Sequence, residues 1–159
     1  MKTPIMNLTQ RFGIALILVL LAGTVVRAAD TAHPVTPSDL VTASQLNSQL
    51  PAVKVGKIVL IHVGFLTMYK MGHIPGSRYA GAASNAGGMA GLKKFVANLP
   101  RDQAIVIYCG CCPWDDCPNI RPAFETLKEM GFSNLKVVDI PERLGDDWTA
   151  KGYPVVKGE

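Results

Sequence analysis

The stretch from Ala104 to Met130 reads AIVIYCGCCPWDDCPNIRPAFETLKEM and combines three kinds of local pattern. Ala104–Tyr108 is a short β-branched run that is apolar without alternation, which indicates a strand buried on both faces, as in a parallel sheet. Residues 119–130 favour a helix, because Pro122 is tolerated in a first turn and Gly131 is a common terminator. The apolar residues of that helix recur at helical spacing: Ile120, Ala123, Phe124, Leu127 and Met130. A strand, a cysteine-rich loop and a helix in this order predict an α/β fold.

The flanking sequence extends the same alternation. Lys57–Val63 and Leu135–Ile140 have the pattern of further buried strands. Thr42 and Gln45 have the spacing of a capping box, so we expect a helix over 43–50 that Pro51 ends. A second helix is expected over 91–99, after a small-residue loop at 80–90. The sequence therefore predicts one α/β domain with a mostly parallel central sheet flanked by helices.

Composition and charge exclude some classes of protein. The 159 residues are 48% hydrophobic and 18% charged, so the chain can bury a core. It has sixteen Lys plus Arg and twelve Asp plus Glu, but three basic residues and no acidic one precede residue 29. The remainder has thirteen basic and twelve acidic residues. Because a nucleic-acid binder needs a basic face, we expect no nucleic-acid partner.

The first 28 residues are typical of a secretory signal peptide. Lys2 and Arg11 are followed by the apolar run Ile14–Ala22, and small residues surround a cleavage site expected after Ala28. We therefore expect a signal peptide at 1–28, a linker at 29–39 and the folded domain at 40–157. The mature protein is expected to be exported, periplasmic or secreted, with no stable membrane insertion after cleavage.

All four cysteines lie within nine residues: Cys109, Cys111, Cys112 and Cys117. Cys109 directly follows a predicted strand, and ligands gather at the carboxyl ends of strands in open α/β sheets. The helix that follows presents free N–H groups and the positive end of its dipole. Both features favour a thiolate, so we predict that Cys109 is an ionised nucleophile that meets an anionic substrate.

Several motifs resemble the rhodanese (sulfurtransferase) family. They are GHIPGS at Gly72–Ser77, IVIYC ending at Cys109, MGFSN at Met130–Asn134 and DWTAKGYPV at Asp147–Val155, in the family order over about residues 41–156. The resemblance implies a rhodanese-like three-layer domain in which Cys109 carries a sulfane sulfur as a persulfide. It also implies thiosulfate or a persulfide as donor, a thiol or cyanide as acceptor, and no organic cofactor.

The active-site loop departs from the family pattern. It is longer than usual, and Cys112 and Trp114 stand where the family has Gly and Arg. Asp115 and Asp116 add negative charge, for which Arg121 is the nearest compensating cation. Upstream, an Asp-Val-Arg of the family is replaced by His62–Gly64. We expect the loop amides and the following residues to bind substrate: Gly110, Cys111, Cys112, Pro113, Trp114 and Arg121.

The other loop cysteines leave several interpretations open. Cys111, Cys112 or Cys117 is a candidate resolving thiol for Cys109, or Cys111 or Cys112 forms a structural disulfide with Cys117. Four cysteines allow three complete pairings. Metal binding is disfavoured, because the spacing differs from structural zinc sites and the adjacent Cys111 and Cys112 are hard to aim at one ion. We therefore predict no metal.

Other functions on the same fold stay open as alternatives. They are a thiol/disulfide redox enzyme, an enzyme acting on an oxyanion such as phosphate or arsenate, and a non-enzymatic module that binds metal or sulfur. His62 and His73 are expected to be structural residues, and Trp148 is expected to pack near the C-terminus.

Overall fold

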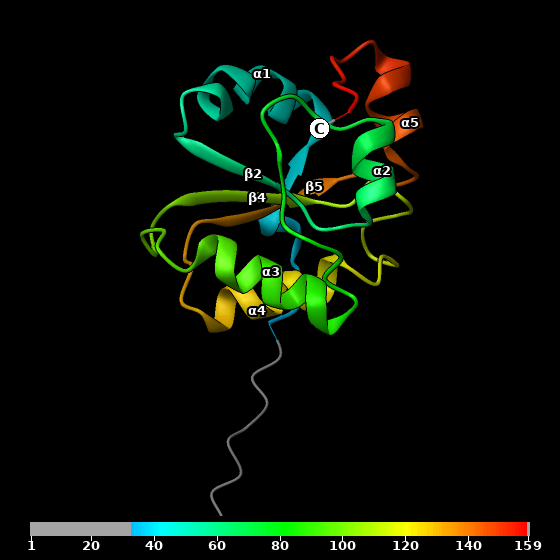
Figure 1. Cartoon of the computed structure of the whole chain (residues 1–159). Helices are drawn as coiled ribbons and strands as arrows, with labels where there is room; N and C mark the ends of the chain where they lie inside the picture. The colour runs from blue at the N-terminus through cyan, green and yellow to red at the C-terminus, as the bar shows by residue number, and fades with distance from the viewer. Residues whose placement is uncertain (1–32, 159) are drawn as a thin grey trace, which may run out of the picture. The chain divides into compact units, whose positions relative to one another are not determined.

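A parallel sheet of five strands forms the centre of the computed structural model, which describes residues 33–158 (Figure 1). The order across the sheet is β1-β5-β4-β2-β3, and every neighbouring pair is parallel. The central position of β4 places its carboxyl end, where Cys109 follows, between the ends of β2 and β5. The strands are β1 (Leu40–Thr42), β2 (Ile58–His62), β3 (Arg78–Tyr79), β4 (Ala104–Tyr108) and β5 (Leu135–Asp139).

Helices cover both sides of the sheet, so the predicted three-layer α/β architecture is confirmed (Figure 1). On one side lie α1 (Ala43–Lys54), α2 (Leu66–Met71) and α5 (Leu144–Asp147). On the other side lie α3 (Ala86–Val96) and α4 (Ile120–Glu129). Two 3-10 helices, η1 (Pro37–Asp39) and η2 (Thr149–Lys151), complete the described elements. No helix among residues 33–158 is long and apolar enough to span a bilayer.

Alternate residues of each central strand enter two separate hydrophobic cores. In β4, Ile105 and Ile107 pack with the core that α3 and α4 cover, whereas Val106 and Tyr108 pack with the core under α1. All four are at most 4% exposed. Since successive side chains of a strand point to opposite faces, a strand between two helical layers must be apolar at every position. This explains the continuous apolar run that the sequence shows.

Helix α1 begins as predicted and ends later. Thr42 and Gln45 form the expected capping box, in which the Thr42 side chain accepts from the Gln45 N–H at 3.2 Å. The prediction that Pro51 ends the helix is wrong, because α1 continues to Lys54. Pro51 removes one N–H donor and crowds the preceding turn, but the last turn is held by Val53, which is buried in the core under α1. The Val55 N–H bonds to the Pro51 carbonyl at 3.3 Å.

The small-residue stretch at 80–90 is only partly a loop. Helix α3 begins at Ala86, capped by the Asn85 side chain, and not near residue 91 as expected. A Cβ built on Gly88 would lie 2.0 Å from the Ala82 carbonyl oxygen, and one on Gly91 would lie 2.5 Å from that of Ala80. The small residues therefore allow the start of α3 to pack directly on the backbone that follows β3.

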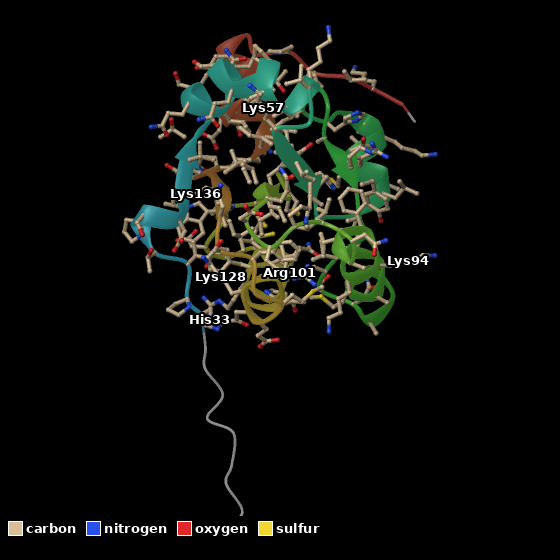
Figure 2. The ribbon with its side chains drawn as sticks, turned by 90° about the vertical axis from the view of Figure 1, so that its left-hand side faces the viewer. His33, Lys57, Lys94, Arg101, Lys128 and Lys136 are labelled. Carbon is tan, nitrogen blue, oxygen red and sulfur yellow. The ribbon has the colours of Figure 1, made fainter. Side chains whose placement is uncertain are left out.

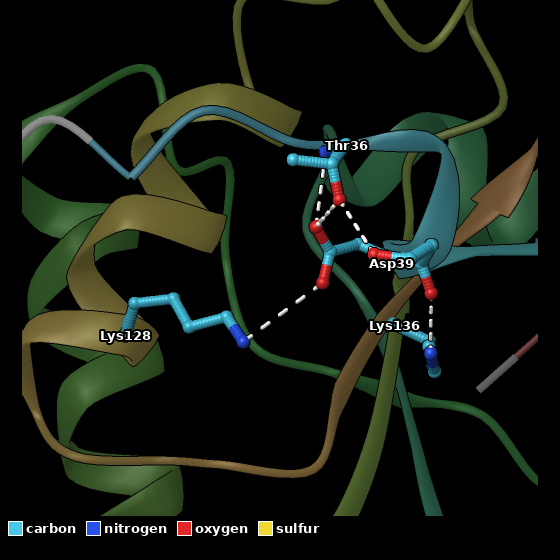
Figure 3. A network of polar contacts seen from close by, with 5 residues as sticks. Thr36, Asp39, Lys128 and Lys136 are labelled. Carbon is cyan, nitrogen blue, oxygen red and sulfur yellow. Dashed lines mark hydrogen bonds and ion pairs between the residues drawn. The ribbon is translucent and has the colours of Figure 1, made fainter.

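The predicted linker contains a structured segment at its end. Thr36 and Asp39 cap η1, and Asp39 faces Lys128 of α4 at 3.9 Å (Figure 3). Burial alone would raise the pKa of Asp39. The hydrogen bonds from Thr36 and the charges of Lys128 and Lys136 have the larger, opposite effect, so the pKa of Asp39 lies below its usual value. Figure 2 labels these two lysines together with the basic residues Lys57, Lys94 and Arg101, which lie apart from one another in this view. The predicted signal peptide and residues 29–32 lie outside the described residues.

Candidate functional site

The four cysteines form one continuous cluster of sulfur atoms beyond the end of β4. All four are free thiols. Cys111 lies at the centre of the cluster, with its Sγ 3.2 Å from that of Cys109, 3.0 Å from that of Cys112 and 3.9 Å from that of Cys117. Cys109 and Cys117 are each 3% exposed, whereas Cys111 and Cys112 are half-buried. The structure therefore contains no disulfide staple, and reagents in solvent reach the cluster from the side of Cys111 and Cys112.

The backbone turns sharply just after Cys109. Gly110 has a φ of 82°, a conformation that residues with a side chain rarely adopt. A Cβ on Gly110 would lie 2.8 Å from the Cβ of Leu144, whose N–H donates to the Gly110 carbonyl at 3.0 Å. The start of α5 thus closes over the turn and fixes the direction in which the cysteine loop leaves β4.

A cavity of about 400 Å³ reaches Cys109, Gly110 and Cys111. Met68 and Met71 of α2 line it on one side. The cations that line it are Arg143, the N-cap residue before α5, and Lys157 near the C-terminus. Sequence reasoning missed both, because each lies more than thirty residues from Cys109 and no local motif marks it. Two cations from another part of the chain therefore line the cavity, and Arg143 also forms an ion pair with Asp146.

The predicted cation Arg121 lies elsewhere. Arg121, Trp114 and Asp115 line a separate cavity of about 230 Å³, which does not include any cysteine. The N–H of Trp114 donates to the Ile140 carbonyl at 3.0 Å, so the expectation that this amide faces the substrate is wrong. Asp115 and Asp116 are exposed, and neither lines the cavity of Cys109. The additional loop residues therefore lie outside the cavity of Cys109, and so do the negative charges of Asp115 and Asp116.

The surroundings favour a thiolate at Cys117 more than at Cys109. The Cys109 thiol and the backbone N–H groups of Asn119 and Ile120 at the start of α4 favour the ionised form of Cys117, whose carbonyl also accepts the Ile120 N–H at 3.2 Å. Together they outweigh burial and lower the pKa of Cys117 to about 5. The hydrogen bond to Cys117, together with burial, raises the pKa of Cys109 well above its usual value. The sequence predicts an ionised Cys109, whereas these pKa shifts favour Cys117 as the thiolate, next to the start of α4.

Three residues surround the sulfur of Cys109. The Asn119 side chain, fully buried, donates from Nδ2 to that sulfur at 3.5 Å and accepts the Ser84 N–H at 3.0 Å. Gly64 lies against it on another side, because a Cβ there would be 2.6 Å from Cys109 Sγ and 2.9 Å from His62 Cε1. Burial lowers the pKa of His62 to about 4, so its ring is neutral and accepts the Gly64 N–H at 3.3 Å.

The GHIPGS segment makes structural contacts. The His73 ring stacks on Tyr69 with centroids 3.8 Å apart, and His73 Nδ1 bonds to the Tyr69 carbonyl at 2.9 Å. The Tyr108 hydroxyl accepts the Ile74 N–H at 3.0 Å and bonds to Ser77 Oγ at 2.8 Å. These bonds join the segment to the last residue of β4. These contacts agree with the predicted structural role of His73. Trp148 packs near the C-terminus as expected, where its Nε1 donates to the Pro154 carbonyl at 2.8 Å.

A metal ion has one group of candidate ligands in the described part of the chain. The sulfur atoms of Cys109, Cys111 and Cys117 all lie within 4.8 Å of one another. Cys112 is not in this group, which agrees with the argument that adjacent cysteines are hard to aim at one ion. The spacing of the cysteines in the sequence does not show that the other three sulfur atoms lie close together. Their proximity arises from the turn at Gly110 and from the return of the chain into α4.

Solved structures share this architecture. The chain matches the BH2092 protein from Bacillus halodurans with a TM-score of 0.58 and 18% identity, over 76% of this chain and 77% of that one. It matches the rhodanese-like domain of the Alr3790 protein from Anabaena with a TM-score of 0.54 and 19% identity, over 75% and 79%.

The chain has a rhodanese-like fold. A further match is an anaerobic ergothioneine biosynthesis enzyme from Chlorobium limicola, solved with trimethyl histidine, with a TM-score of 0.55 and 22% identity. It covers 74% of this rhodanese-like chain but only 27% of that enzyme. No family model and no curated protein sequence matches the chain.

Proposed function

We propose that the protein is a sulfurtransferase in which Cys109 carries a sulfane sulfur as a persulfide. The observation that supports this proposal most is the position of Cys109: a free thiol at the carboxyl end of the central strand, lining a cavity that Arg143 and Lys157 also line. A cavity that a thiol shares with two cations favours an anionic sulfur donor such as thiosulfate. The rhodanese-like fold agrees with a sulfur-related function.

The transfer balances without an external oxidant. Cys109 Sγ attacks the outer sulfur of the donor, its proton passes to the neighbouring sulfur of Cys117, and a new S–S bond forms. The S–S bond of thiosulfate breaks, and sulfite leaves with the electron pair. A thiol or cyanide acceptor then attacks the outer sulfur of the persulfide, and Cys109 leaves as a thiolate. The Asn119 side chain, which donates to Cys109 Sγ, stabilises the negative charge that forms there in both steps.

The proximity of Cys111 to Cys109 favours a second candidate function, a thiol/disulfide reaction at Cys109. With its sulfur 3.2 Å from that of Cys109, Cys111 is placed to attack the inner sulfur of the persulfide. That step forms a Cys109–Cys111 disulfide and releases hydrosulfide, and an external thiol must then reduce the disulfide. The two candidates share the persulfide and differ in whether a thiol acceptor or Cys111 consumes it.

Intact mass spectrometry separates these outcomes. The reduced protein is treated with thiosulfate without oxygen, and thiosulfate-to-cyanide turnover is measured in parallel. We expect a gain of one sulfur atom, absent in Cys109→Ser and retained in Asp116→Asn, an exposed residue of the same loop. A loss of two hydrogen atoms with release of hydrosulfide would support the second candidate. Sulfur loading and turnover that persist in Cys109→Ser would contradict both.

A further inference from the structure

We propose that Cys109, Cys111 and Cys117 form a binding site for one monovalent copper ion. Their sulfur atoms lie within 4.8 Å of one another, with 3.2 Å between Cys109 and Cys111 and 3.9 Å between Cys111 and Cys117. At a metal–sulfur bond of about 2.3 Å, three sulfurs in a plane around one ion lie about 4 Å apart. Small side-chain rotations therefore bring the three atoms to the distances of a trigonal thiolate site.

The remaining donors near the cysteines select copper over zinc. Structural zinc takes four ligands in a tetrahedron, usually from Cys and His. The nearby His62 uses Nδ1 to accept the Gly64 N–H. The Cys112 sulfur contacts that of Cys111 at 3.0 Å, but Cys112 is not among the residues whose sulfur atoms all lie within 4.8 Å of one another. The other sulfur atoms that line the cavity belong to Met68 and Met71. Thioether and thiolate donors together are the set that Cu(I) prefers.

The two methionines also mark a path of entry. Met71 is 72% exposed and Met68 is half-buried, and both line the cavity that reaches Cys109 and Cys111. Residues three apart lie on one face of a helix, so α2 presents both thioethers to the same cavity. A copper ion that enters from solvent therefore meets weaker thioether ligands at the mouth and stronger thiolate ligands at the bottom.

The charges around the site are compatible with three thiolates. Three thiolates and one Cu(I) ion carry a net charge of two negatives. Lys157 lines the same cavity, as does Arg143, which also pairs with Asp146. Binding displaces the thiol protons, so copper competes with protons for the site. It also occupies Cys109, which makes copper binding and persulfide formation mutually exclusive. The copper site itself does not depend on the proposed sulfur transfer.

Anaerobic titration of the purified protein with Cu(I) against the chromophoric chelator bicinchoninate tests the site. We expect one ion per chain, and X-ray absorption of the loaded wild-type protein should show three sulfur neighbours. Cys111→Ser and Cys117→Ser should each weaken binding by about 100-fold or more, since even residues that only support a ligand contribute 10- to 100-fold. Cys112→Ser, from the same loop, should retain one ion. Met71→Leu should retain one ion but take it up more slowly.

Several results would overturn the site. They are no copper held against the chelator, a wild-type absorption spectrum with nitrogen or oxygen neighbours, or equal weakening by Cys112→Ser and Cys111→Ser. Tight Zn(II) binding with four sulfur neighbours would also contradict the choice of metal. Sulfur loading is measured on the same copper-free sample. Copper binding without sulfur loading would contradict the proposed function only, whereas sulfur loading without copper binding would contradict this inference only.

Discussion

At the scale of single residues, the environment of Cys109 depends on groups that come from three parts of the chain. Gly64 follows β2, Asn119 precedes α4 and Leu144 begins α5. The sequence places Cys109 at a strand end correctly, because the apolar run before it is unambiguous. It does not show that the pKa of Cys117 is lowered, because that depends on how the loop places Cys117 beside Asn119 and Ile120.

Gly64→Ala tests how closely the chain packs on Cys109. The added methyl group would lie 2.6 Å from Cys109 Sγ, so the sulfur must move. Overpacking of this kind costs about 1–3 kcal/mol of folding free energy. We expect a loss of that size in urea denaturation, together with slower sulfur loading. Gly145→Ala is the control, since a Cβ there meets nothing within 4 Å. Equal effects of the two substitutions would show that Gly64 is not a special contact.

The neutral His62 predicts how stability depends on pH. Burial lowers its pKa from 6.5 to about 4, a bond to the Cys109 backbone opposes this shift, and the charge of His73 adds to it. The unfolded chain therefore binds a proton that the folded chain does not bind between pH 6.5 and 4. Stability should fall by about 3 kcal/mol as the pH drops through this range, and this contribution should level off below it.

Chemical denaturation of the wild type and of His62→Gln over this range measures the contribution. Tyr69, Tyr79 and Tyr108 pack against the His62 ring, and His73 lies nearby, so only the difference between the two proteins isolates His62. The wild type should lose stability more steeply than the variant. Parallel curves would mean that the ring is already protonated or exposed in the folded protein.

At the scale of elements, the long apolar patterns predict the structure well and the short elements do not. β2, β4, β5 and α4 all form where the sequence indicates, because the strands are apolar runs buried between two helical layers and α4 buries a periodic apolar face. The two-residue β3 and the three-residue β1 carry too little pattern to be recognised. The early start of α3 at Ala86 depends on contacts of Gly88 and Gly91 with distant backbone, which no local rule contains.

Asn119 joins the start of α4 to the two segments beside it. Asn119→Ala removes the acceptor for the Ser84 N–H and the donor to Cys109 Sγ. We expect a loss of about 1–3 kcal/mol in urea denaturation and slower sulfur loading. Asn85→Ala removes the cap of α3 and should cost about 1 kcal/mol, but it should leave the rate of sulfur loading unchanged. Unchanged loading in Asn119→Ala would exclude a role in stabilising the charge on Cys109.

At the scale of the whole molecule, the fold brings side chains from distant segments of the chain to the cavity of Cys109. The two cations that line the cavity of Cys109 come from the last seventeen residues of the chain, and the methionines come from α2. The fold class follows from strand and helix alternation alone. The lining of the cavity does not, because it depends on where the chain ends return to the sheet.

The predicted signal peptide makes a separate prediction for the whole chain. If residues 1–28 direct export, the protein recovered from a Gram-negative expression host should lie in the periplasmic fraction. Its N-terminus should be Ala29, because the small side chains before that point suit signal peptidase. Intact mass of the recovered protein and N-terminal sequencing measure this directly. A full-length chain in the cytoplasmic fraction would contradict the prediction.

The central claim is that the sulfane sulfur resides on Cys109. Tandem mass spectrometry of the cysteine-loop peptide tests it most directly, after thiosulfate treatment of the reduced wild-type protein and alkylation without oxygen. The account predicts one additional sulfur on Cys109 and alkylated thiols at Cys111, Cys112 and Cys117. An additional sulfur found on Cys111, Cys112 or Cys117 while Cys109 carries only the alkyl group would contradict it.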